Sequence, residues 1–138
     1  MFKLFTLTEA TRLLPVIEGH VADLQRASRD AEEVKRRLAE INERPGTERA
    51  AVRVESQNLM QELGFLARCA HDSKADLDRL GVELTDLEGG AVAIPASVGG
   101  EVVALTWTRG QSGITHYRRL TGDTAPHPLP SETRLREA

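Results

Sequence analysis

The stretch LLPVIEGHVADLQRASRDAEEVKRRLAEI, residues 13–41, determines the fold, because its apolar residues recur in alternating steps of three and four. This spacing is typical of an α-helix that packs against another helix. Thr6 and Glu9 form a predicted capping box at its start. Pro15 lies inside the pattern, whose phase continues past it, so we expect a kink rather than an end. The contact positions are Ala10, Leu13, Ile17, His20, Leu24, Ala27, Ala31, Val34, Leu38 and Ile41.

A second helix is predicted after the break NERPGTE, residues 42–48, where Pro45 and Gly46 precede the capping residue Thr47. The helix is expected to end at Gly81, a common residue at helix C-termini. Its contact positions are Val52, Ser56, Leu59, Leu63, Leu66, Ala70, Ser73, Leu77 and Leu80.

The two rows of contact positions match each other when the chain is folded back about Pro45. Every layer then joins one contact position from each helix, which predicts a long antiparallel hairpin. The predicted opposite pairs include Leu24–Leu66, Leu38–Val52 and His20–Ala70.

After Gly81 the hydrophobic period changes to two, which indicates β-strands. AVAIPASV and EVVALTW flank Gly99–Gly100, a pair typical of a tight hairpin turn. RGQSG then reverses the chain into ITHYRRL, and either residues 82–84 or FKLF at residues 2–5 is expected to add an edge strand. The predicted fold class is therefore α+β, a long antiparallel two-helix hairpin (about 7–80) followed by a small antiparallel β-meander (about 82–121). Residues 1–121 form one domain, and residues 122–138 are predicted to be a Pro-rich, loosely docked tail.

Composition narrows the class of protein further. The chain has 138 residues and a net charge of −3, which makes nucleic-acid binding unlikely because phosphate affinity comes mainly from Lys and Arg. Cys69 is the single cysteine, so no internal disulfide forms and a reducing compartment is expected. The sequence contains no long apolar run, so we expect a cytoplasmic protein without a membrane span.

Three stretches resemble a family of small bacterial proteins described as a domain of unknown function: FTLTEATRLLP, GVELTDLEGGAVAIPA and VVALTWTRG. In that family the last strand often carries Trp-His-Glu after an acidic turn. Here the strand has Tyr117, Arg118 and Arg119, and Gln111 occupies the turn. The resemblance therefore implies the architecture and no activity.

Two histidines are candidate metal ligands. His20 lies among the contact positions, and His71 is one residue away from Ala70, its predicted opposite residue. Zinc usually has three or four protein ligands, and only two are found here. The alternatives are that His20 is a partly buried histidine that hydrogen-bonds to a neighbour, or an exposed histidine beside a small alanine.

Tyr117 and Arg119 are a candidate anion-binding pair, since they lie on the same side of the last strand. The alternative is that Arg119 or Arg118 forms a cross-strand ion pair with Glu101.

No motif identifies catalytic residues, and none implies a cofactor. The sequence favours a non-enzymatic interaction or structural module that forms a homodimer through its helices, since small sheets cover long hairpins poorly. The alternatives are a binder of small molecules or anions (possibly an enzyme) that uses Tyr117 and Arg119 on the outer sheet face, and metal binding at the hairpin by His20 and His71.

Overall fold

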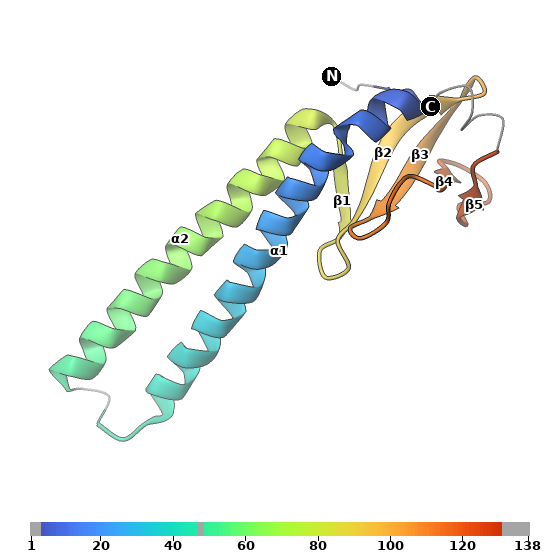
Figure 1. Cartoon of the computed structure of the whole chain (residues 1–138). Coiled ribbons are helices and arrows are strands. Elements are labelled where there is room, and N and C mark those ends of the chain that lie inside the picture. Colours follow the sequence, from blue (N-terminus) through green and yellow to red (C-terminus); the bar gives the residue numbers. More distant parts are fainter. Residues whose placement is uncertain (1–3, 47–48, 131–138) are drawn as a thin grey trace.

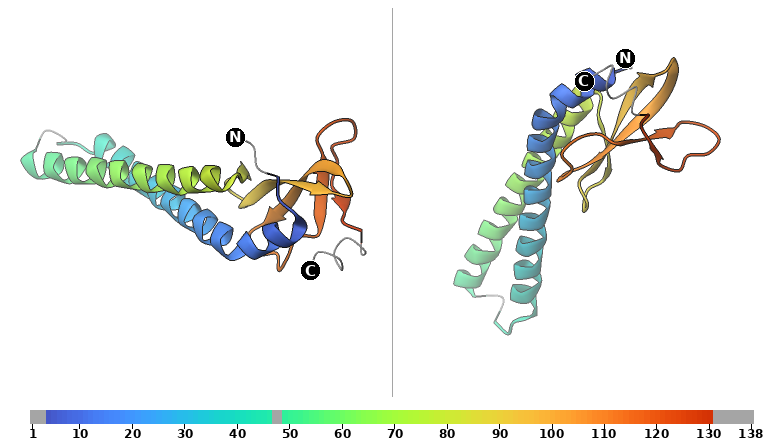
Figure 2. Two further views of the ribbon diagram at one scale, coloured as in Figure 1. Left: turned by 90° about the horizontal axis from the view of Figure 1, so that it is seen from above. Right: turned by 45° about the vertical axis from the view of Figure 1, so that its right-hand side comes forward.

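The structure, a computed structural model, describes residues 4–46 and 49–130 and has the predicted α+β architecture. A long helical hairpin leads into a five-stranded antiparallel sheet at one of its ends (Figures 1 and 2). We refer to the part of the hairpin beyond the sheet, residues 28–46 and 49–69, as the arm. The elements are α1 (Leu7–Glu43), α2 (Ala50–Leu80), β1 (Glu83–Asp86), β2 (Ala91–Val98), β3 (Glu101–Thr108), β4 (His116–Arg119) and β5 (His127–Pro128).

Helix α1 begins at the predicted capping box. The Glu9 amide donates to Thr6 Oγ1 over 3.1 Å, and the Thr6 amide donates to Glu9 Oε1 over 3.0 Å. Pro15 lies inside the helix, which continues through it, and the N-terminal turns bend away from the rest of α1 (Figure 1). Both features agree with the sequence.

Helix α2 begins less favourably. Arg49 occupies its N-cap position without a side-chain hydrogen bond, and the first turn has no acidic residue to interact with the helix dipole. The predicted capping residue Thr47 lies outside the described residues. The C-terminal cap is Gly81, as predicted.

The sheet has the strand order β1-β2-β3-β4-β5. Both predicted edge segments take part, because β1 pairs with residues 91–93 of β2 while Phe5 bridges to Ala96 farther along the same strand. The sheet also extends beyond the predicted boundary at residue 121. His127–Pro128 pairs with β4, and Leu129 is only 2% exposed, so this part of the expected tail packs against the core because its apolar residue has a site there.

The main core lies between the sheet and the first half of α1. Alternate residues of β2 and β3 face the helices, and α1 contributes one apolar residue per turn. Leu77 and Leu80 add the end of α2. The buried members from the two central strands are Val92, Ile94, Ala96, Val103, Leu105 and Trp107.

A smaller cluster, here called the tip cluster, holds the arm together. Its fully buried members are Val34, Ile41 and Leu59, with Leu38, Val52, Leu63 and Leu66 partly buried around them. No described helix is long and apolar enough to cross a membrane.

The helices pair in a register about one heptad away from the predicted one. His20 Nδ1 lies 3.7 Å from Asp76 Oδ2, which is nearly two turns beyond Ala70, the predicted opposite residue. Leu24 packs in the main core and Leu66 in the tip cluster, so these residues are not the predicted pair.

The error has a physical cause. A seven-residue repeat matches another such repeat equally well after a shift of one heptad, so the turn must determine the register. Because α2 begins at Ala50, the hairpin reverses beyond Pro45. Leu38 and Val52, the other predicted pair, both pack around the tip cluster, but in the observed register they do not lie opposite each other, so this prediction is wrong as well.

The capping box gives a first prediction. Thr6→Ala should lower the free energy of unfolding by about 1 kcal/mol, because the Glu9 amide loses its acceptor. Urea denaturation measures this, and Thr8→Ala in the same turn serves as the control. Equal losses in the two variants would show that the cap contributes nothing.

Candidate functional site

The structure separates the two candidate metal ligands. His20 faces Asp76 across the hairpin, and this pair carries opposite charges only when the imidazole is protonated. His71 is exposed. Within residues 4–46 and 49–130, no group of three or more His, Cys, Asp or Glu residues is arranged to hold a metal ion. His20 therefore has a carboxylate neighbour across the hairpin, at a distance longer than a hydrogen bond.

Tyr117 and Arg119 do lie on one side of β4, opposite Leu105 and Val103 of β3. This side of β4 faces the helices, however, so the prediction that Tyr117 and Arg119 lie on the outer face of the sheet is wrong. The prediction treated Ile114 as part of the strand. In the structure β4 begins at His116, and the buried Ile114 precedes the strand. The outer side carries His116 and Arg118 instead.

Each member of this pair has its own neighbour. Arg119 Nε lies 3.6 Å from Glu101 Oε1, the cross-strand pairing of the alternative interpretation. Tyr117 packs against the ring of His127, with the ring centroids 5.7 Å apart. The Arg119 guanidinium is therefore already compensated by a carboxylate.

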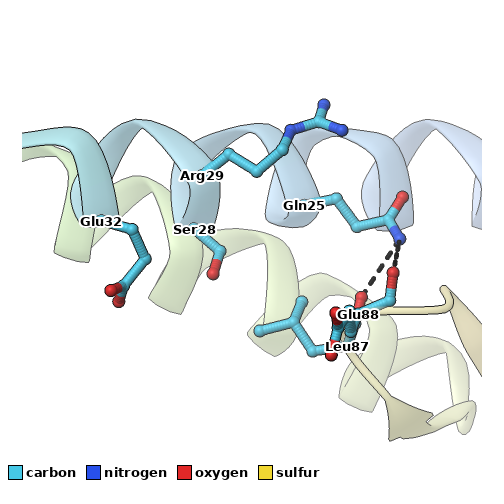
Figure 3. A pocket seen from close by; sticks show the side chains of 6 residues that line it. All are labelled: Gln25, Ser28, Arg29, Glu32, Leu87 and Glu88. Carbon is cyan, nitrogen blue, oxygen red and sulfur yellow. Dashed lines mark hydrogen bonds between the residues drawn. The ribbon is translucent and has the colours of Figure 1, made fainter.

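A groove that the sequence did not predict lies between α1 and the β1–β2 turn. It encloses about 440 Å³ where the arm leaves the sheet (Figure 3). Its lining residues are Gln25, Ser28, Arg29, Glu32, Leu87 and Glu88.

Gln25 joins the helix to the turn. Its Nε2 donates to the carbonyl oxygens of Leu87 and Glu88, each over 3.1 Å (Figure 3). Its Oε1 accepts from Arg109 Nη1 over 3.1 Å. One side chain therefore connects three parts of the chain: α1, the β1–β2 turn and the end of β3. This connection ties α1 to the sheet at the point where the arm begins.

Gly90 permits this contact. It has φ +75°, and an added Cβ would lie 2.9 Å from Gln25 Nε2 and 3.0 Å from Arg109 Cβ. A side chain would therefore be strained and would displace Gln25. Periodicity could not reveal Gln25, because a polar residue in the middle of an amphipathic helix looks like an ordinary surface residue.

The groove wall is polar at its rim and apolar at its base. Leu87 remains 37% exposed. Glu32 pairs with Lys35 over 3.2 Å, whereas Glu88 and Arg29 have no ion pair within the described part of the chain.

A second groove lies on the opposite face of the hairpin. Its floor includes Ala27, Leu66 and the 56% exposed Phe65. Its remaining lining residues are Asp23, Arg26, Asp30, Cys69, Asp72 and Ser73. Three acids and one Arg make its rim acidic.

Farther out, the arm is covered by exposed ion pairs. Arg36 bonds to both Glu33 and Glu40, and its hydrogen bonds hold the pKa of Glu33 below the ordinary value for a glutamate. The reciprocal contact raises the pKa of Arg36. Because their side chains are about half exposed, these pairs support the helix only locally.

Removal of the Gln25 amide tests its role. Gln25→Ala should lower the free energy of unfolding by about 1–3 kcal/mol and speed amide exchange at Gly89 and Gly90, since three hydrogen bonds are lost. Ser28→Ala, one turn along the same groove, is the matched control. Unchanged exchange in the turn would contradict the assigned connection.

The Arg119–Glu101 pair gives a further prediction. Arg119→Ala should lower the free energy of unfolding by at most about 1 kcal/mol, because both partners are about half exposed. Sulfate should then change the melting temperature of the wild type and the variant equally. A sulfate effect confined to the wild type would instead identify an anion site.

No curated protein and no solved structure matches the chain. A family model does match it over residues 3–125, which include the hairpin and the sheet as far as β4. The family resemblance of the sequence is thereby confirmed. The chain belongs to the DUF2203 family of uncharacterized conserved proteins.

Proposed function

We propose that the protein is an interaction or structural module that forms a homodimer through its helical hairpin. The observation that carries this proposal is the small core of the arm. Val34, Ile41 and Leu59 are its fully buried apolar residues in the tip cluster, over more than four turns of each helix. Isolated helices of this length are marginal in water, and tertiary burial supplies most of their stability.

Exposed apolar side chains on the arm support the same proposal. Met60 and Phe65 are 61% and 56% exposed, and neither can be covered by the sheet, which lies at the other end. Two hairpins packed side by side would bury apolar surface in a four-helix arrangement, most simply about a two-fold axis. We place this homodimer in the cytoplasm, in keeping with its single cysteine.

The other candidate activities have less support. A metal at the hairpin would need ligands beyond His20 and His71, and an anion at Arg119 would compete with Glu101. Neither site is a concavity lined by convergent polar groups.

Sedimentation of the full chain over a micromolar concentration range tests the proposal. We expect a species of twice 15.2 kDa that dissociates on dilution, with amides near the α1–α2 connection losing protection as it does. A 15.2 kDa species at every concentration, with fully protected amides there, would refute self-association, because the arm would then be rigid alone.

A further inference from the structure

We infer that the second groove binds a small organic cation, an ammonium group carried on an apolar body. This inference goes beyond the proposed homodimer and does not depend on self-association. The groove lies between α1 and α2 where the arm begins, and it encloses about 440 Å³. This volume is in the range of binding sites for small molecules.

The groove carries an excess of negative charge. Three of its lining residues are aspartates, Asp23, Asp30 and Asp72, and one is a base, Arg26. Arg26 lies 3.5 Å from Asp23 and compensates that carboxylate. Asp30 and Asp72 have no ion pair within residues 4–46 and 49–130. One carboxylate on each helix is therefore left without a counter-charge.

The charges next to the groove do not cancel this excess. Glu62 and Arg68, which adjoin the groove on α2 without lining it, balance each other. Arg29 lines the first groove instead. The other neighbouring charges have partners of their own, namely Asp76 with Arg79 and His20, and Glu33 with Arg36 and Arg37.

Ser73 supplies an independent observation that points to a ligand. The residue is only 9% exposed, and its hydroxyl has no hydrogen-bond partner within the described part of the chain. Among those same residues, His127 Nε2 is the one fully buried side-chain polar atom without a partner, so the Ser73 oxygen retains some access. Because Ser73 lines the second groove, this access is from the groove. Buried hydroxyl groups are normally hydrogen-bonded, and this one can bond to a molecule held there.

The floor of the groove favours an organic cation over a metal ion. No group of three or more His, Cys, Asp or Glu in the described ranges is arranged to hold a metal. The floor is instead apolar, with Ala27, Leu66 and the exposed ring of Phe65. An apolar body would bury area on this floor, and the face of the Phe65 ring attracts a cation.

The chemistry of an ammonium group matches the polar part of the groove. It has three N–H donors and no acceptor, which suits the Ser73 hydroxyl oxygen and a carboxylate such as that of Asp72. A neutral molecule of the same shape would leave the carboxylates of Asp30 and Asp72 uncompensated. Charge therefore provides the specificity, and the apolar floor adds affinity.

Titration of the full chain with 2-phenylethylammonium chloride tests the site. We expect saturable NMR shifts at the backbone amides of Phe65, Cys69 and Ser73. The neutral control is 2-phenylethanol, which has the same apolar body with a hydroxyl in place of the ammonium. It should bind at least about ten-fold more weakly, because it makes no charge-assisted hydrogen bond.

Three variants show whether the named residues hold the ammonium. Asp72→Asn should raise the dissociation constant by about five-fold and Ser73→Ala by about three-fold, since each removes one acceptor. Asp78→Asn is the matched control, because it makes the same change of charge in the same helix outside the groove. Its carboxylate pairs with Lys74 over 3.3 Å, and its removal should leave ammonium binding unchanged. Circular dichroism of each variant checks that the helices are retained.

The outcomes separate clearly. Saturable ammonium binding that is weakened by Asp72→Asn and Ser73→Ala, but not by Asp78→Asn, supports the site. Absence of saturable shifts, equal binding of 2-phenylethanol, or an equal loss with Asp78→Asn overturns it. None of these results bears on self-association, which sedimentation tests separately.

Discussion

The length of the helices relative to the sheet governs the rest of this structure. Helix α1 has 37 residues, about 55 Å at 1.5 Å per residue, whereas the eight-residue strands β2 and β3 span about 26 Å. The sheet can therefore cover only one end of the hairpin. There the core contains Trp107 and many branched side chains, while the uncovered arm depends on the tip cluster and on exposed ion pairs.

Because of this difference in length, the contacts at the junction between the sheet and the arm matter for the orientation of the arm. Two long helices attached to a sheet at one end would pivot if only apolar contacts held them, because such contacts are not directional. Gln25 supplies direction through hydrogen bonds to the carbonyl groups of the β1–β2 turn and from Arg109. The same connection shapes the groove containing Leu87, because Gln25, Leu87 and Glu88 all line it.

Periodicity predicted the parts of the structure whose residues repeat. The rows of contact positions, the capping box at Thr6 and the strands flanking Gly99–Gly100 all follow local rules of spacing and turn chemistry. Periodicity could not predict the helix register, because two heptad repeats match equally well after one of them is shifted by seven residues. Single long-range contacts were also missed: Gln25 to the turn, and Leu129 in the core after a Pro-rich stretch.

The glycines of the chain are of two kinds: at some the fold excludes a side chain, and at others a side chain would fit. Gly90 is required from within, because its backbone conformation and the approach of Gln25 exclude a side chain. Gly64 meets no such demand, although glycine weakens the helix at that position. Gly19 of α1 has the same property, since a Cβ there would also meet nothing within 4 Å. In the proposed homodimer, a second hairpin would bury the apolar surface of the arm that the sheet is too short to cover.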